Sequence, residues 1–222
     1  MPDSFDRNLA ELSSSAAAIE QFVDELGLET TVDLDGKVHE KEDLIGEDSC
    51  KDLIYFYDSS MQDMYDSSHQ IDLKGFQDGS LNLSAKELIS IIGEVEAQKI
   101  LNFFYASVGK APVSKILLRR TDSDGRSGNH LDFHTDEAEA GYKQSTVIVA
   151  LNADSDVNGG ALYYLNRNGP TKYRRSQGKA FAHAYNVLHA VAPLEGSRYS
   201  LIICFDQSDN SDKSIIDGTG LI

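Results

Sequence analysis

The strongest constraint on the fold of this chain is a series of short apolar segments that begins near residue 113. Their lengths and their β-branched and aromatic content are typical of strands, and glycine-containing turns such as 158–160 and 194–196 separate them. The segments are residues 113–120, 129–136, 145–152, 160–165, 179–183, 186–191 and 198–205. A doubly wound α/β fold needs helices between its strands, and these intervals are too short to hold them. We therefore predict a mainly β fold with a jelly-roll core, also described as a double-stranded β-helix.

The chain before these segments has the periodicity of amphipathic helices. Residues 8–26 carry apolar side chains at three- and four-residue steps, and Gly27 is a suitable end. A second helix is expected from Ser84 to Gly109, and it opens on the capping-box sequence Ser84-Ala85-Lys86-Glu87. We expect the N-terminal helices to pack on one sheet of the β core.

Between these helices, residues 53–57 fit either a strand or a buried helical turn, and residues 58–80 have the Asp- and Ser-rich composition of a loop. Long polar loops often cover cavities, so residues 53–80 are a candidate lid. We divide the chain into an N-terminal extension of helical and loop elements, residues 1–80, and a jelly-roll core with its supporting helix, residues 81–222.

The composition excludes several classes of function. The chain of 222 residues carries a formal net charge of −16, from 20 basic and 36 acidic residues, and such a field repels nucleic-acid phosphates. Cys50 and Cys204 lie far apart, which excludes a disulfide framework and a CxxC site, and Cys204 lies in an apolar run typical of a buried thiol. No window approaches the ~18 apolar residues of a membrane span, and the N-terminus lacks the pattern of a signal peptide. We expect a cytoplasmic protein with no nucleic-acid and no membrane partner.

The segment 129–136 places metal-binding side chains at every second position, in His130, Asp132, His134 and Asp136. Alternate residues of a strand share a face, so all four are expected to point the same way. Two His-x-Asp pairs therefore compete for one role. We favour the second pair because the polar sequence that follows should leave the strand and open on a cavity, whereas the first pair fits a supporting hydrogen-bonding role.

A third ligand is available in His189, within the apolar segment 186–191. Two imidazoles and one carboxylate on one face leave other coordination positions open, and this is the donor set of non-haem iron(II) oxygenases. Taken alone, a His-x-Asp pair is often solvent-exposed, and His189 fits a hydrogen-bonded core position. His183 and His69 have no partner in the sequence and are treated as structural. Only the combination indicates a metal site.

An arginine and a serine in the last strand-like segment stand two positions apart and are expected to share a face. The planar fork of Arg198 binds a carboxylate through two hydrogen bonds, and the Ser200 hydroxyl adds one. A charged side chain among buried strands needs a partner, so Arg198 fits either a salt bridge within the chain or an anchor for a dicarboxylate ligand.

With this combination of a His-x-Asp pair, a distant histidine and an Arg-x-Ser pair, the segment from about 115 to 206 resembles the iron(II)- and 2-oxoglutarate-dependent dioxygenases, especially their prolyl-hydroxylase-like branch. The resemblance covers a little under half of the chain, and residues 1–80 take no part in it. It rests on the identity and order of five stretches: His134-Thr135-Asp136, residues 145–152, residues 158–162, His189, and Arg198-Tyr199-Ser200.

The resemblance implies that His134, Asp136 and His189 bind Fe(II), and that Arg198 with Ser200 binds the distal carboxylate of 2-oxoglutarate. It also implies that O₂ and 2-oxoglutarate are consumed, that an unactivated C–H of the substrate is hydroxylated, and that ascorbate serves as reductant. Related halogenases have a small residue in place of the carboxylate ligand. The presence of Asp136 therefore favours hydroxylation.

The co-substrate pocket departs from the family pattern at one position. Many prolyl hydroxylases carry a tyrosine where this chain has Ala150, so another residue has to complete the pocket. Leu118 and Arg120 on the preceding strand are candidates. The Gly159-Gly160 turn is expected to be a structural corner between strands.

The substrate is less constrained than the chemistry. The branch that the chain resembles favours a peptidyl proline, and a free amino acid or small metabolite is the alternative. Residues 166–175 form a basic patch that fits either an anion-binding site or a solvated loop. A non-catalytic metal-binding jelly-roll protein and a cupin-type enzyme without 2-oxoglutarate also fit the ligand set. Only the oxoglutarate interpretation needs Arg198 and Ser200 inside the cavity.

Overall fold

The computed structural model describes residues 4–28, 31–66, 76–77, 79–123, 131–136 and 143–208. Its helices are α1 (Ser4–Leu12), α2 (Ala16–Leu26), α3 (Glu47–Asp66), α4 (Ala85–Ile92) and α5 (Glu94–Ser107). Its strands are β1 (His39–Lys41), β2 (Phe76–Gln77), β3 (Ser80–Asn82), β4 (Val113–Ser123), β5 (Leu131–His134), β6 (Gln144–Ala150), β7 (Asn158–Gly159), β8 (Leu162–Asn166), β9 (Gly169–Tyr173), β10 (Ala180–His183), β11 (His189–Val191) and β12 (Leu194–Asp206).

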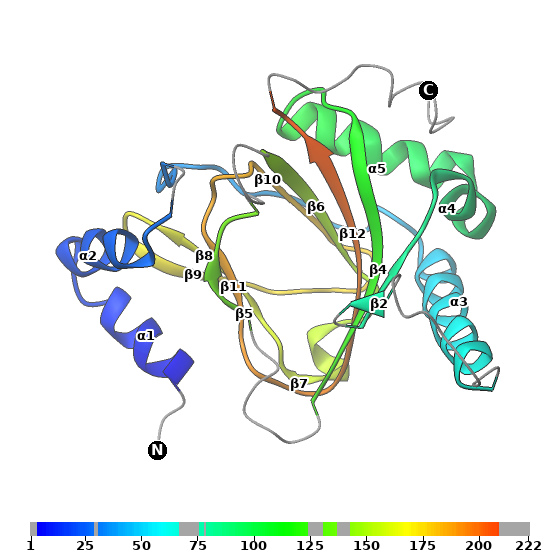
Figure 1. Cartoon of the computed structure of the whole chain (residues 1–222), viewed down its shortest axis with the longest axis horizontal. Helices are drawn as coiled ribbons and strands as arrows, with labels where there is room; N and C mark the ends of the chain where they lie inside the picture. Colours follow the sequence, from blue (N-terminus) through cyan, green and yellow to red (C-terminus); the bar gives the residue numbers. More distant parts are fainter. Residues whose placement is uncertain are drawn as a thin grey trace.

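The strands form two antiparallel sheets, as Figure 1 shows. The large sheet has the order β1-β10-β6-β12-β4-β3-β2, with β7 paired to β12. The small sheet has the order β5-β11-β8-β9. Apolar side chains from both sheets, among them Ile148, Leu162 and Phe181, fill the space between them. The prediction of a mainly β fold is therefore confirmed as a sandwich of two antiparallel sheets.

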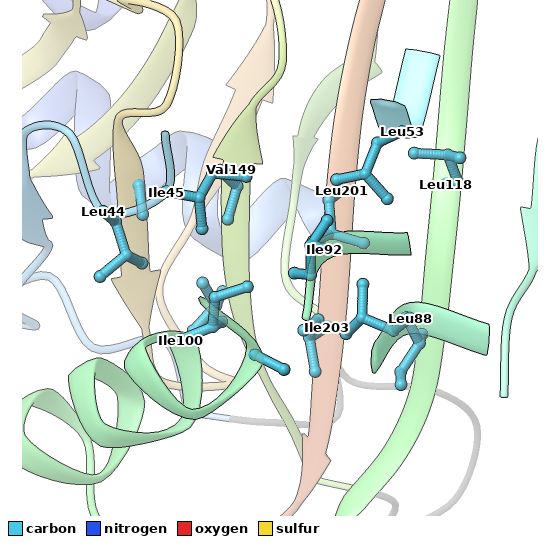
Figure 2. Packing of buried hydrophobic residues seen from close by; sticks show 14 of the residues in the cluster. Leu44, Ile45, Leu53, Leu88, Ile92, Ile100, Leu118, Val149, Leu201 and Ile203 are labelled. Carbon is cyan, nitrogen blue, oxygen red and sulfur yellow. The ribbon is translucent and has the colours of Figure 1, made fainter. Parts of the chain in front are cut away.

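Helices α3, α4 and α5 cover the outer face of the large sheet (Figure 1). The outward side chains of β4, β6 and β12 meet buried side chains of these helices in one core, and Figure 2 labels among them Leu118, Val149, Leu201, Leu53 and Ile100. Burial of each such side chain contributes roughly 1.5–3 kcal/mol to the hydrophobic stabilisation. Because successive residues of a strand face opposite ways, this packing turns the alternate residues of β4, β6 and β12 toward the small sheet.

Helices α1 and α2 cover the outer face of the small sheet instead. Phe5 of α1 and Ile19 of α2 share a core with Phe133 of β5 and Leu165 of β8. The rings of Phe5 and Phe133 stack with their centroids 6.4 Å apart. The sequence led us to expect the N-terminal helices on one sheet, but the helices divide between both sheets.

Two helices that the periodicity predicted as continuous are each interrupted. The first is broken at Ser13–Ser15, where the Ser15 hydroxyl accepts a hydrogen bond from the Ala18 N–H and begins α2. The second is broken at Gly93, whose φ of 81° ends α4 before α5 starts. The capping box of Ser84 and Glu87 is present as predicted. The first break is set by a serine side chain that hydrogen-bonds to the backbone, and the second by a glycine at positive φ. Neither feature changes the spacing of apolar residues, so the hydrophobic periodicity could not predict the breaks.

The region between the helices was partly mispredicted. Residues 53–57 are helical, and residues 58–66 belong to α3 and not to a loop. Residues 67–75 and 78 lie outside the described residues, so the rest of that prediction is untested. Because α3 packs on the outer face of the large sheet, its residues do not form a lid over the space between the sheets.

Three smaller findings complete the fold. Strand β9 was missed because Gly169-Pro170 has the sequence of a turn, but proline is tolerated on an edge strand, which β9 is. Cys50 and Cys204 are free and buried, as predicted for Cys204. None of the described helices combines the length and the apolar character needed to cross a lipid bilayer.

The corner at Gly159 gives a test of the fold. Gly159 has a φ of 88°, and a Cβ at this position would lie 2.1 Å from the carbonyl oxygen of Pro193. We expect Gly159→Ala to lower the free energy of unfolding by more than about 1 kcal/mol, because backbone strain and a backbone clash combine. Gly93→Ala is the matched control, since Gly93 has a φ of 81° but no described atom within 4 Å of the added carbon. Equal losses in urea unfolding of the two variants would contradict the assigned corner.

Candidate metal centre

The two predicted histidine ligands are neighbours across a pair of strands. Strands β5 and β11 pair antiparallel, and His134 stands directly opposite His189 in their register. The neighbouring Phe133 packs outward among the N-terminal helices, which turns the imidazole of His134 inward. The centroids of the two imidazole rings lie 4.3 Å apart.

The third predicted ligand follows the end of β5. Asp136 lies two residues beyond His134, and one ligand atom from each of His134, Asp136 and His189 lies within 4.8 Å of the other two. The Asp136 Oδ1 atom is 3.5 Å from the His189 Nε2 atom. The structure therefore brings together all three side chains that the sequence singled out.

Hydrogen bonds to the backbone orient both imidazoles. The His134 Nδ1 atom lies 2.7 Å from the carbonyl oxygen of Asp132, and the His189 Nδ1 atom lies 3.2 Å from that of Val187. Each carbonyl can only accept, so Nδ1 carries the proton and the lone pair of Nε2 is left for another partner. Burial lowers the pKa of each histidine to about 4, although the Asp136 carboxylate acts to raise both pKa values. Both rings are therefore neutral near pH 7, as metal ligands must be.

The Asp136 carboxylate is held from the large sheet. The Thr146 hydroxyl of β6 donates a hydrogen bond to Asp136 Oδ2, and the Nε2 atom of His183 lies 3.7 Å from the same oxygen. Burial acts to raise the pKa of Asp136, but the histidines and the Thr146 hydroxyl outweigh it and the pKa is lowered. Oδ2 is thus occupied by protein contacts, and the ionised Oδ1 faces His189.

Sequence reasoning missed the roles of Thr146 and His183. His183 is fully buried, stands opposite Thr146 in the pairing of β10 with β6, and its Nε2 atom has no hydrogen-bond partner among the described residues. Neither residue has a recognisable signal in the sequence, because only the register of the large sheet places them beside Asp136. Of the competing pair, Asp132 is exposed and is not among the residues that line the site, and His130 lies outside the described residues.

Arg198 and Ser200 lie in the interior, as predicted. They are 6% and 3% exposed, and the Nε atom of Arg198 is buried without a hydrogen-bond partner within the described part of the chain. Gly160 lies against the side chain of Arg198, since a Cβ on Gly160 would be 3.4 Å from the Arg198 Cδ atom. Burial, and then the charges of two further arginines, Arg175 and Arg119, lower the pKa of Arg198. An uncompensated guanidinium in this position fits an acidic ligand.

These residues line one cavity of about 80 Å³. It is bounded by both sheets, and its lining residues are Arg119, His134, Asp136, Thr146, Ile148, Leu162, His189, Val191, Arg198, Ser200 and Ile202. The prediction that Leu118 or Arg120 completes the pocket was wrong, because both point to the outer face of β4. Leu118 packs in the helical core and Arg120 pairs with Asp58, whereas Arg119 between them faces the cavity.

The basic patch predicted at 166–175 does not act as one surface. Arg167 is exposed and binds Asp35, with 2.8 Å between Nε and Oδ1. Arg175 is 3% exposed and turns inward, where its Nη2 atom donates to the carbonyl oxygen of Tyr199 at 2.9 Å and lies 3.4 Å from the Ser200 Oγ atom. The Ser200 oxygen therefore accepts from Arg175, which leaves its own proton for a ligand.

The donor set fits a divalent iron ion and a dicarboxylate. Two neutral imidazoles and one carboxylate supply three ligands on one side, which leaves positions on the cavity side open. The orphaned Arg198 Nε and the free Ser200 proton offer hydrogen bonds to a carboxylate in the same cavity. Both predicted groups therefore fit the residues that are present.

No protein-family model matches the chain, and no curated protein sequence matches it. Solved structures are similar in fold. The viral collagen prolyl hydroxylase vCPH from Paramecium Bursaria Chlorella virus-1, solved as a 2OG complex, has 15% identity and a TM-score of 0.54 over 78% of this chain and 97% of its own. A prolyl hydroxylase from Trichoplax adhaerens, in complex with a hypoxia inducible factor peptide fragment, has 13% identity and a TM-score of 0.56 over 86% and 90%. The non-heme monooxygenase ThoJ, as a nickel complex, has 15% identity and a TM-score of 0.59 over 78% and 74%.

These likenesses confirm the resemblance that the sequence predicted, at the level of the fold. Structures that share 13–15% of their residues with the chain establish its architecture and leave its reaction open. The function therefore has to be inferred from the residues of the site.

The two histidines make the stability of the metal-free protein depend on pH. Their pKa values are about 4 in the folded chain, against 6.5 as the ordinary value, so between these limits mainly the unfolded chain binds the protons. As pH falls through this window, we expect each histidine to lower the free energy of unfolding by about 1.4 kcal/mol per pH unit. Urea unfolding with a chelator present measures this slope. The double variant His134→Asn/His189→Asn should flatten it, and an unchanged slope would contradict burial of the neutral rings.

The hydrogen bond from Thr146 gives a test of the carboxylate. In Thr146→Val, Asp136 Oδ2 loses its donor while the volume is kept, and we expect affinity for Ni(II) to fall about tenfold. Thr146→Ser keeps the hydroxyl and should retain most of the affinity. Metal titration followed by calorimetry measures both variants. If the valine and serine variants bind Ni(II) equally, Thr146 does not support the ligand.

Proposed function

We propose that this chain is a cytoplasmic Fe(II)- and 2-oxoglutarate-dependent dioxygenase with a jelly-roll core, which hydroxylates an unactivated C–H of its substrate. The observation that carries the proposal is the convergence of His134, Asp136 and His189 in one cavity with Arg198 and Ser200. A metal-binding protein without this reaction has no need of a buried guanidinium whose Nε has no hydrogen-bond partner among the described residues beside the metal ligands.

The residues of the chain would bind the iron and hold its ligands in a fixed orientation. His134, Asp136 and His189 would hold the iron from one side, with Nδ1 of each histidine tied to a carbonyl and Asp136 Oδ2 tied to Thr146. The bound iron would supply the activation of O₂ that C–H hydroxylation needs. The presence of the Asp136 carboxylate supports hydroxylation over halogenation, because the third protein ligand position is filled.

Arg198 and Ser200 would bind the distal carboxylate of 2-oxoglutarate. Their burial strengthens a charge-assisted hydrogen bond, since little water competes for the guanidinium. Arg175 donates toward the Ser200 oxygen, which leaves the Ser200 proton for the co-substrate. Apolar side chains such as Ile148, Leu162 and Val191 line the rest of the cavity and exclude water.

The substrate we propose is a peptidyl proline, with a free amino acid or small metabolite as the alternative. Two of the similar structures are prolyl hydroxylases, which supports the first choice, and a third is a non-heme monooxygenase. We also propose that residues 1–80 are an extension and that 81–222 carry the catalytic core. The candidate ligands and the lining residues all belong to this second part.

The proposal is tested by uncoupled turnover. Protein supplied with Fe(II), 2-oxoglutarate, O₂ and ascorbate, and with no substrate, should release succinate, and His134→Ala should abolish the release. Arg198→Gln should raise the KM for 2-oxoglutarate about tenfold to a hundredfold, because a charged hydrogen bond worth roughly 1.5–3 kcal/mol is lost. The exposed Arg174→Gln is the control and should change neither value.

The same assay separates the rival interpretations. Succinate release that survives His134→Ala would contradict the metal site. A wild-type protein that binds Fe(II) but neither releases succinate nor binds 2-oxoglutarate would indicate a non-catalytic metal-binding protein or a cupin-type enzyme.

A further inference from the structure

Arg119 is a cavity residue that the proposed reaction does not use. It lies on β4, directly opposite Ser200 in the register of β4 with β12, and its side chain lines the same cavity as the candidate metal ligands. Its positive charge contributes to lowering the pKa of His134, a candidate metal ligand, and also the pKa of Arg198, the candidate co-substrate anchor. The guanidinium therefore lies within electrostatic reach of both the candidate metal ligands and the co-substrate anchor.

The charge of Arg119 has no ion-pair partner among the described residues. Within the described part of the chain, no carboxylate lies within 4.0 Å of its nitrogens, and its Nε atom is buried with no hydrogen-bond partner. Arg120, the next residue, is on the opposite face and is bound to Asp58 at 3.1 Å. In a chain with a net charge of −16, an unpaired buried guanidinium nitrogen is unusual, because carboxylates are abundant and the desolvation of the group costs free energy.

A formal count of charge over the described residues leaves one positive charge in the cavity after the dianion 2-oxoglutarate is added. A divalent ion and the guanidiniums of Arg119, Arg175 and Arg198 would carry five positive charges, and the carboxylates of Asp136 and Asp154 carry two negative ones, where Asp154 accepts a hydrogen bond from the Arg175 backbone. After both charges of the co-substrate are subtracted, one positive charge remains. Arg198 and Ser200 serve one carboxylate and the metal serves the other, so Arg119 is the surplus cation.

Arg119 stands on the open side of the cavity. Among the lining residues, Arg119, His134, Asp136 and Ile202 are partly exposed, whereas the others, including Arg198 and Ser200, are buried. The co-substrate anchor is therefore at the closed end. A primary substrate has to approach the metal from the side where solvent reaches, and it passes Arg119 there.

We propose that Arg119 binds an oxyanion of the primary substrate, a carboxylate or a phosphate, and thereby holds the reacting carbon beside the metal. The planar fork of a guanidinium matches both groups. The proposal rests on the proposed function and narrows it to substrates with an acidic group near the hydroxylated carbon. The acidic surface of the chain repels large polyanions, so the substrate is a small acid or a short peptide segment with one acidic group.

The test measures a second anion beside a bound co-substrate. The protein is loaded with Mn(II) and saturated with 2-oxoglutarate, and acetate or inorganic phosphate is titrated while nuclear relaxation of the anion is followed. Bound near the paramagnetic ion, the anion should relax faster in a saturable manner, and the Zn(II)-loaded protein is the blank. Comparison of acetate with phosphate tells which oxyanion the site prefers.

The variants decide the role of Arg119. Arg119→Gln should weaken the affinity for the second anion at least about tenfold and leave the affinity for 2-oxoglutarate within about threefold, and Arg119→Lys should be intermediate because it keeps the charge without the fork. Arg120→Gln, on the opposite face of the same strand, should bind the second anion like the wild type.

Three results would overturn the proposal: no second anion bound by the wild type, an equal affinity in Arg119→Gln, or a loss of 2-oxoglutarate affinity in that variant as large as in Arg198→Gln. The last result would assign Arg119 to the co-substrate. A failure of the proposed function gives a different result, because the Mn(II)-loaded wild type would then not bind 2-oxoglutarate at all. In that case the anion is titrated into the Mn(II)-loaded protein without 2-oxoglutarate.

Discussion

The candidate site depends on one pair of short strands, β5 and β11, which places His134 directly across from His189. The register of this pair is irregular, because three residue steps from Leu131 to His134 on β5 are matched by two steps from Val191 to His189 on β11. Such a bulge re-aims side chains on the longer strand. It also explains why Asp132 is exposed while His134 turns inward, although strict alternation placed both on one face.

The polar groups of the interior are gathered rather than scattered. The space between the sheets is otherwise apolar, and its buried polar atoms without a partner in the described chain include the Nε atoms of Arg119, Arg175 and Arg198, the His183 Nε2 and the Tyr164 hydroxyl. Each such atom costs free energy when it is buried without a hydrogen bond. Their concentration around the candidate ligands is expected for a site that is organised before its ligands arrive, because the bound ligands supply the missing partners.

The sequence was sufficient to select the five side chains that meet in the cavity, His134, Asp136, His189, Arg198 and Ser200, since residue type, two-residue spacing and the order of the segments together pointed to them. It was not sufficient for Arg119, Arg175, Thr146 and His183. The run Leu117-Leu118-Arg119-Arg120 has no alternation of polar and apolar residues, so the face of each residue is set only by the helices that cover Leu118. Arg175 looks like part of a solvated patch until the chain folds back toward Ser200. Periodicity likewise predicted helices correctly but missed the breaks at Ser15 and Gly93, which depend on a cap and on a positive φ.

The chemistry that we propose is divided between the two sheets. His134 and His189 belong to the small sheet, whereas Arg198, Ser200 and Thr146, which holds Asp136, belong to the large one. A metal ion bound to both histidines and to Asp136 would therefore link the sheets and stabilise the folded chain. The separation of the sheets is set by the apolar side chains between them, among them Ile148 and Leu162. The distance from the metal to the co-substrate anchor is consequently a property of core packing, and a change of volume in that layer alters it without touching a ligand.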